Sequence, residues 1–262
     1  MNWKVAARRE LVPLLVLLCV GRPTRAAKME TAKTPVLVEL FTSQGCPSCP
    51  PADAWVQTLD ATQPVPDAQV IVLSEHVDYF DEDGWTDPYS QEQLSDRQGA
   101  YARSLRLTVY TPQIILDGDA ELHAYDAAQT RQKLEQAATA PALPMHLDHA
   151  EDDGRGLTVH VATDAGAPTQ SGDVFLAVAI DKTVSDVLAG ANDGKTLTNV
   201  AVVKQLVKIG KVEQGKPFDL TFYLKLWPFA DPANMRVVAF VQEPGPGKVL
   251  GVAMTKEIRK GQ

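Results

Sequence analysis

Cysteine is scarce in this sequence, because the 262 residues contain only Cys19, Cys46 and Cys49. A structural zinc site usually takes four cysteine or histidine ligands, commonly from two paired knuckles, and only one Cys-x-x-Cys is present. Of the five histidines, His146 and His149 fall at an expected strand start, where they would point to opposite faces. We therefore expect no zinc, although two thiolates and one histidine leave a copper site open.

Long hydrophobic runs are lacking as well. The one sustained run, at positions 11–20, follows the basic residues Lys4, Arg8 and Arg9 and precedes the small residues of TRAA. Its length of about ten residues is too short to span a bilayer, which needs about 20. We therefore expect residues 1–27 to be a cleaved signal peptide, exported by the general or the twin-arginine route. The mature protein is expected to be periplasmic or secreted, without stable membrane insertion.

Positive charge is in deficit. The chain has 25 Lys and Arg against 33 Asp and Glu, a formal net charge of −8. Cleavage after residue 26 would remove five basic residues and one acidic residue, which leaves 20 against 32 and a balance of −12. Such a surface repels phosphate backbones and anionic lipids, so nucleic acid is not an expected partner.

The pattern of apolar residues predicts two domains. Over residues 33–140 it indicates the order β-α-β-α-β-β-α, with buried strands in TPVLVELF and AQVIVLSEH and a hairpin at Asp117-Gly118. The linker APALP follows. Residues 145–258 hold six strand-like runs separated by turn clusters, which favours an antiparallel β-sandwich. One of these runs, residues 199–210, could instead be a short helix.

Cys46 and Cys49 lie between a predicted strand and a predicted helix. A helix N-terminus stabilises a thiolate, so Cys46 could attack a partner disulfide while Cys49 resolves the mixed species. A purely structural disulfide across four residues would add only about 2 kcal/mol of stability. Pro50 and Pro51 leave two arrangements open: Cys46 caps the helix, or CPSC is a tight turn that feeds a helix starting later.

The segments CPSC and VYTPQIILDG resemble those of the thioredoxin superfamily. This resemblance implies a thioredoxin-like α/β fold for residues 33–140 and a cis peptide bond between Thr111 and Pro112. It also implies that Pro112 faces the CPSC pair at an exposed helix entrance and helps hold the backbone of a substrate. A cis bond is physically permissible there, because X–Pro bonds have a low cis penalty.

More specifically, the chain is similar to a family of secreted thioredoxin-like proteins known as domain of unknown function 1223. The matching stretches cover most of residues 35–255, and they include VELFTSQGCPSCPPAD, HVDYFDEDGW, RQGAYARSL, VYTPQIILDG, GANDGKTLTNVAVVK and VVAFVQEPGPGKVLGVA. The family label carries no established reaction. Thiol-disulfide chemistry is implied by the fold and the motif.

Three further residues are candidates for this site. Glu39 could relay a proton for the resolving thiol, but it lies seven residues before Cys46, where thioredoxins have an offset of six. The alternative is a hydrogen-bonded glutamate at a sheet end. His76 and Trp85 are the ends of the acidic segment HVDYFDEDGW (residues 76–85) and could line a substrate groove. His76 could also shuttle a proton. Alternatively, this segment only packs Trp85 on the domain.

The sequence thus predicts an exported thiol-disulfide oxidoreductase. It would act on a disulfide-containing protein or a small thiol, use Cys46 and Cys49, contact substrate through Thr111 and Pro112, and need no cofactor. The alternative is a non-catalytic module that binds copper(I) or a partner protein. The direction of electron transfer, the partner and the oligomeric state are not fixed by the sequence.

Overall fold

The structure is a computed structural model that describes Met1 and residues 33–124, 126–164 and 169–261. The expected signal peptide, residues 1–27, lies outside the described residues except for Met1. Within the described part of the chain, no helix is both long and apolar enough to cross a bilayer.

The first part of the described chain has the predicted order of elements. These elements are β1 (Thr34–Thr42), α1 (Pro50–Thr62), β2 (Ala68–His76), α2 (Glu92–Leu105), β3 (Gln113–Leu116), β4 (Ala120–Leu122) and α3 (Ala127–Thr139). Residues Asp117 and Gly118 both have positive φ angles and turn the chain between β3 and β4, which confirms the predicted hairpin.

The second part is built almost entirely of strands. Its elements are β5 (Met145–Asp152), β6 (Gly156–Thr163), β7 (Gly172–Asp186), the 3-10 helix η1 (Gly190–Asn192), β8 (Thr196–Val212), β9 (Asp219–Lys225), the 3-10 helix η2 (Pro232–Asn234), β10 (Met235–Gln242), β11 (Val249–Thr255) and β12 (Arg259–Lys260). Residues 199–210 therefore belong to a strand and not to a helix.

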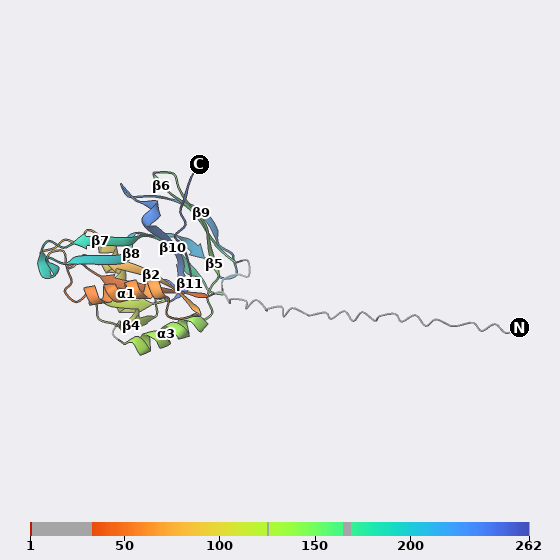
Figure 1. The fold of residues 1–262 in the computed structure, drawn as a ribbon, viewed down its shortest axis with the longest axis horizontal. Helices are drawn as coiled ribbons and strands as arrows, with labels where there is room; N and C mark the ends of the chain where they lie inside the picture. The colour runs from red at the N-terminus through yellow and green to blue at the C-terminus, as the bar shows by residue number, and fades with distance from the viewer. Residues whose placement is uncertain (2–32, 125, 165–168, 262) are drawn as a thin grey trace. The chain divides into compact units, whose positions relative to one another are not determined.

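Strands from both parts form one sheet, so the predicted fold class is wrong. The order of this eight-stranded sheet is β11-β10-β7-β8-β2-β1-β3-β4, and a second sheet has the order β12-β5-β6-β9. The junction is the parallel pairing of β2 with β8, in which Ser74 lies opposite Val202. The chain is thus mostly β, with two mixed sheets, and is not a thioredoxin-like α/β domain joined to a separate sandwich (Figure 1). Apolar periodicity identified the strands but contained no information about which strand pairs with which.

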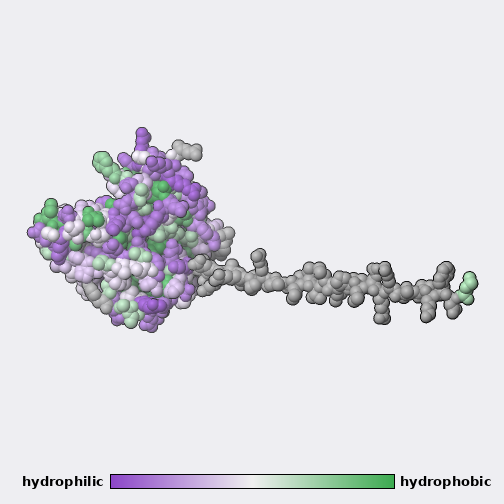
Figure 2. All heavy atoms as spheres, viewed as in Figure 1, coloured by the Kyte–Doolittle hydropathy of each residue, from purple (hydrophilic) through white to green (hydrophobic). Residues whose placement is uncertain are grey.

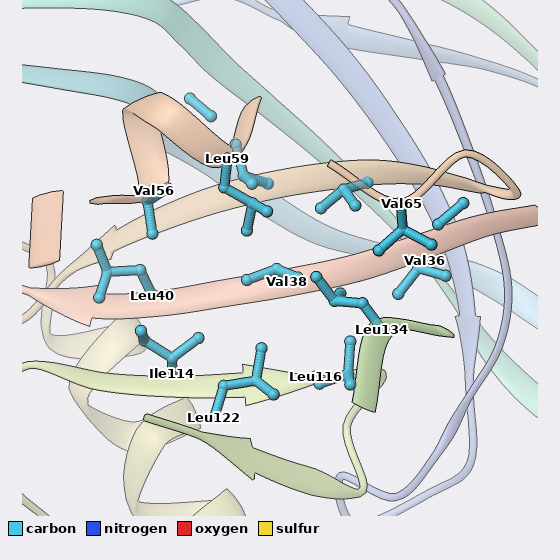
Figure 3. Close-up of a cluster of buried hydrophobic side chains, with 14 of the residues drawn as sticks. Val36, Val38, Leu40, Val56, Leu59, Val65, Ile114, Leu116, Leu122 and Leu134 are labelled. Atoms are coloured by element: carbon cyan, nitrogen blue, oxygen red, sulfur yellow. The ribbon is translucent and has the colours of Figure 1, made fainter. Parts of the chain in front are cut away.

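The two faces of the large sheet are covered differently. On one face, α1 and α3 pack over β1, β2 and β3, and the four-stranded sheet packs over β7, β8 and β10. On the other face, Leu94 of α2 packs against β1 and β2. Figure 3 shows Val36, Val38 and Leu40 of β1 meeting side chains of α1 and α3. Because side chains alternate along a strand, residues 37, 39 and 41 of β1 point to the face that carries α2.

Candidate functional site

The two cysteines lie in the turn that joins β1 to α1, which we call the cysteine turn (residues 43–49). Helix α1 begins at Pro50, and Cys49 is its N-cap residue. Cys46 lies one turn before Cys49, and Cys49 N donates a hydrogen bond to Cys46 O. The two sulfurs form a disulfide, and the Cα atoms are 5.4 Å apart. Pro50 and Pro51 occupy the first helical positions, where backbone N–H groups have no partner inside the helix. CPSC is therefore a tight turn that feeds the helix.

The cysteine turn lies beside the cis peptide bond between Thr111 and Pro112. Ser48 connects the two: its Oγ donates a hydrogen bond to Thr111 O at 3.3 Å and lies 3.4 Å from Cys46 Sγ. The Thr111 Oγ1 atom is buried without a hydrogen-bond partner among the described residues. The structure thus brings together the segments that the sequence singled out.

Both cysteines are buried, in contrast to the expected exposed helix entrance. Cys46 is 1% exposed and Cys49 is 0% exposed, although Pro47 and Ser48 between them are exposed. A thiolate must reach a disulfide sulfur to exchange with it. The conformation described here therefore does not admit a partner to either sulfur.

A buried pair of titratable residues, His76 and Asp87, is hydrogen-bonded to the cysteine turn. His76 ends β2 on the face that carries α1, and its Nδ1 lies 2.7 Å from Asp87 Oδ2. The same carboxylate oxygen accepts a hydrogen bond from Gln44 N at 2.7 Å. Burial alone would lower the pKa of His76, but the charge of Asp87 and its hydrogen bond outweigh it and raise that pKa above 6.5. Correspondingly, burial would raise the pKa of Asp87, but His76 and the backbone bonds hold it below 3.8.

His76 is completely buried, so in this conformation it does not line an open groove. Its Nε2 atom has no hydrogen-bond partner among the described residues. The ring thus has one nitrogen committed to Asp87 and one free to exchange a proton when the surroundings admit a donor or acceptor.

Asp53 is a second buried acid at the site. It lies one helical turn after Cys49, donates its backbone N–H to Cys49 O at 3.1 Å, and accepts a side-chain hydrogen bond from Thr42 Oγ1 at 2.8 Å. Burial raises the pKa of Asp53 to about 6, and His76 and Thr42 partly oppose this rise. Asp53 is therefore a buried carboxyl group with a pKa of about 6, one turn of α1 after Cys49.

Glu39 lies on the opposite face of β1. Arg97 Nε donates to Glu39 Oε1 at 2.8 Å, and Tyr101 OH donates to Glu39 Oε2 at 2.5 Å. Glu75 of β2 lies in the same cluster, with Arg97 Nε 3.5 Å from its Oε1. Glu39 is therefore held in an ion pair across the sheet from α1, and the geometry does not support the predicted proton relay. The offset of seven residues was the sequence signal for this outcome, because one extra position reverses the direction of a side chain.

Trp85, at the end of the acidic segment, is hydrogen-bonded to the cysteine turn. It is half-buried, and its Nε1 donates to Gln44 Oε1 at 3.3 Å. From the tip of the β7–β8 hairpin, Asn192 Nδ2 donates to Gln44 O at 2.8 Å and to Cys46 O at 2.9 Å. Figure 1 shows this tip at the left end of the molecule. Trp85 and Asn192 thus reach the same turn from two different segments.

Sequence reasoning missed Asp53, Asp87 and Asn192. Asp53 follows Ala52 on the helical face that packs on the sheet, so its position one turn after Cys49 was a usable signal. Asn192 lies in the turn cluster GANDGK between two strand-like runs, without a chemical motif around it. Its contact with Cys46 joins residues 146 positions apart, and no local pattern reports such a contact.

The described residues contain no group of three or more His, Cys, Asp or Glu side chains arranged to hold a metal ion. The pairing of two cysteines with one histidine that a copper site needs is not formed within them. The titratable and redox-active groups gathered at the site are the two sulfurs, Asp53, Asp87 and His76.

Comparison with solved structures gives one extensive match. The crystal structure of protein AGR_C_4864 from Agrobacterium tumefaciens aligns with a TM-score of 0.68 and 27% sequence identity, over 85% of this chain and 94% of that chain. Spo0M, a sporulation control protein from Bacillus subtilis, aligns with a TM-score of only 0.33 and 14% identity, over 47% of this chain and 51% of that one. Comparison with curated proteins gives no match.

Comparison with protein families gives a match over most of the described body. The sequence model of the family described as protein of unknown function (DUF1223) matches residues 37–242, which include the cysteine turn, Thr111–Pro112 and the β7–β8 hairpin. The chain therefore belongs to the DUF1223 family of proteins of unknown function.

Proposed function

We propose that this protein is an exported thiol-disulfide oxidoreductase whose reacting groups are Cys46 and Cys49. The observation that carries the proposal is the position of the disulfide at the start of α1, next to the cis Thr111–Pro112 bond and linked to it through Ser48. The N-terminal end of a helix favours a thiolate over a thiol, so the pair can be reduced and reoxidised reversibly.

The exchange would run through a mixed disulfide. In the reduced protein, the Cys46 thiolate attacks one sulfur of a partner disulfide, forms the Cys46–partner bond and releases the other partner sulfur as a thiolate that takes a proton. The Cys49 thiolate then attacks Cys46 Sγ, which restores the Cys46–Cys49 disulfide and releases the second partner thiol. Two electrons pass from the protein to the partner, and the reverse sequence oxidises a partner dithiol. No organic cofactor takes part.

Asp53 is the group best situated to take the proton of the resolving thiol. Its buried carboxyl follows Cys49 by one turn of α1, and its pKa of about 6 lets it accept a proton at neutral pH and release it again. The proposal assigns to Asp53 the relay that the sequence suggested for Glu39. Thr111 and Pro112 remain the proposed contact for the partner's backbone.

The burial of both sulfurs sets a condition on this function. An oxidoreductase of this design reacts only when the cysteine turn is uncovered. The same burial favours a second candidate function, a partner-binding module in which the disulfide stays permanently oxidised. Copper(I) binding by the reduced pair is the other form of this alternative.

The two functions differ in the behaviour of the pair. We expect the mature protein to show a midpoint potential in the range of about −120 to −270 mV that thiol-disulfide oxidoreductases span, and to catalyse reduction of insulin by dithiothreitol. Cys46→Ser should abolish that catalysis, and His146→Gln on the small sheet should leave it unchanged. A potential below about −300 mV, or copper(I) retained after dialysis together with no catalysis, would establish the binding module instead.

Export is tested separately. Expression of the full chain with its N-terminal segment should yield a periplasmic or secreted protein whose first residue, by N-terminal sequencing, is Ala27 or Lys28. Recovery of the intact chain in the cytoplasm would overturn this part of the proposal.

A further inference from the structure

One buried side chain anchors the tip of the β7–β8 hairpin, residues 187–195, on the cysteine turn. Asn192 is 0% exposed, although Ala191 and Asp193 on either side of it are exposed. Its two amide protons go to Gln44 O and Cys46 O, and its Oδ1 accepts from Lys195 Nζ at 2.9 Å. A buried amide is tolerated only when its hydrogen bonds are made, and here both donors are used on the turn that carries Cys46.

A second contact seats the hairpin tip. Gly190 has a φ of +74°, and a Cβ built on it would lie 3.1 Å from Trp85 Cβ. A side chain at this position would therefore be strained and would push the tip away from Trp85. Since Trp85 also donates to Gln44, the hairpin tip, the acidic segment and the cysteine turn meet around one residue.

The outer side of the hairpin is free. Leu188 is 75% exposed and Val184 is 62% exposed, and Figure 2 shows hydrophobic atoms at this end of an otherwise largely hydrophilic surface. The hairpin tip also has internal hydrogen bonds, from Val187 N to Lys195 O and from Gly194 N to Val187 O, both 2.9 Å. Among the described residues, the side-chain hydrogen bonds from residues 187–195 to the turn are those of Asn192. Val187 of the tip is fully buried, and Gln44 Nε2 also donates to Asn199 Oδ1 of β8 at 3.4 Å.

We propose that the hairpin tip is a cover that controls access to the Cys46–Cys49 disulfide, and that Asn192 is the positioning residue that holds it closed. In the closed state, Asn192 fixes the carbonyls of Gln44 and Cys46, and both sulfurs are out of reach of solvent. Opening breaks those two hydrogen bonds and frees the cysteine turn. The rate of opening therefore limits the rate at which any reactant reaches the sulfurs, whether the disulfide is being reduced or the dithiol oxidised.

This inference deepens the proposed function, because a covered disulfide is the form of the oxidoreductase that does not react with passing thiols. It does not require the oxidoreductase activity to be real. A permanently oxidised disulfide would have the same cover, and its reaction with an added reductant would be limited in the same way.

The test measures the rate at which tris(2-carboxyethyl)phosphine reduces the disulfide of the oxidised mature protein. Asn192→Ala removes both hydrogen bonds to the cysteine turn, and we expect reduction to become about tenfold faster, which corresponds to about 1.4 kcal/mol in the opening equilibrium. The matched control is Asn234→Ala. Asn234 also exchanges two hydrogen bonds with one backbone segment, at Lys182, but neither reaches the cysteine turn.

Asn192→Asp ties the effect to the hydrogen bonds of residue 192, while the comparison with Asn234→Ala separates it from general loosening. At pH 7 its carboxylate faces two carbonyl oxygens, so we expect reduction faster than in wild type, and at pH 4 protonation restores one donor and brings the rate back toward wild type. The titratable groups around the turn, Asp53, His76, Asp87 and Lys195, are common to both proteins. The ratio of the reduction rate of Asn192→Asp to that of wild type at each pH therefore reports the effect of residue 192.

Two results would overturn the cover. One is a rate for Asn192→Ala within twofold of wild type, with a native circular dichroism spectrum. The other is an equal acceleration in Asn192→Ala and Asn234→Ala, which would mean general loosening. If Asn192→Ala does not fold, the ratio for Asn192→Asp decides, and a ratio that does not change with pH rejects the proposal. Insulin reduction is scored separately, so loss of the proposed function leaves this result intact.

Discussion

The two faces of strands β1 and β2 bury titratable side chains in different ways. On the α2 face, Glu39 and Glu75 surround Arg97, whose guanidinium also contacts Tyr101 and Gln242. On the α1 face, His76, Asp87 and Asp53 lie beneath the cysteine turn, and His76 Nε2 has no partner among the described residues. The first cluster is hydrogen-bonded within the core, and the second lies below a disulfide-bearing turn and the hairpin tip that we propose as its cover. Burial of charge therefore identifies a functional site only when a reactive group and a route to solvent are near it.

The largest expected effect is on the α2 face. Arg97→Met removes the cation between two buried acids, and we expect the free energy of unfolding to fall by about 3–5 kcal/mol. Urea unfolding of the oxidised protein measures this. Arg131→Met is the control, because Arg131 pairs with Glu135 on an exposed helix surface and should change stability by less than about 0.5 kcal/mol. Equal losses in the two variants would contradict the difference between a buried and an exposed pair.

On the α1 face, replacing Asp53 should raise the free energy of unfolding, by less than Arg97→Met lowers it. The pKa of Asp53 is about 6 in the folded protein against 3.8 in the unfolded chain, so the folded state binds more protons between these values and stability falls as pH rises. Asn at this position keeps an acceptor for Thr42 and carries no charge. Asp53→Asn should therefore gain up to about 3 kcal/mol over wild type as pH rises from 4 to 7.

The measurement is urea unfolding at each pH, and the comparison is with Asp60→Asn, which removes a partly exposed carboxylate paired with Arg236 at the other end of α1. That variant should lose stability at pH 7. A constant difference between Asp53→Asn and wild type across the pH range would show that Asp53 does not titrate there.

Asp87→Asn should cost about 2 kcal/mol near pH 5, because the carboxylate accepts from Gln44 and pairs with His76. The lowered pKa of Asp87 supplies stability that is lost as pH falls below 3.8. The raised pKa of His76 supplies stability that is fully present below pH 6.5 and lost as pH rises through its folded value. The loss should therefore be greatest between about pH 4 and 6.5.

Proton NMR of the imidazole checks the same pair directly. The pKa of His76 should fall in Asp87→Asn, because the variant removes the charge and the hydrogen bond that raise it. An unchanged His76 would mean that Asp87 is not the source of its shift.

The smallest effect is expected at the hairpin tip. Gly190→Ala places a Cβ 3.1 Å from Trp85 at a positive φ, and we expect a loss of about 1–2 kcal/mol by thermal unfolding. Gly194→Ala is the control for backbone strain alone, because its φ is also +74° but no atom lies within 4 Å of the added Cβ. Only Gly190→Ala should also speed reduction of the disulfide, and equal reduction rates in the two variants would argue against the contact with Trp85.

The sequence predicted the elements better than their assembly. The order of strands and helices over residues 34–139, the Asp117-Gly118 hairpin and the turn at Cys46–Cys49 follow from local patterns, and the structure has all three. The fold class failed at the pairing of Ser74 with Val202, because an apolar strand fits beside many partners and its periodicity is the same in each. At the site, the cis Thr111–Pro112 bond was expected from resemblance, whereas the burial of the cysteines depends on segments distant in sequence.

The connection between Asn192 and the cysteine turn has a consequence for biosynthesis. Asn192 and Cys46 are 146 positions apart, so a chain synthesised from its N-terminus contains Cys46 and Cys49 long before Asn192 is added. Under the proposed cover, that early interval is when an oxidant reaches the two sulfurs most easily. Oxidation after folding would depend on opening of the hairpin tip.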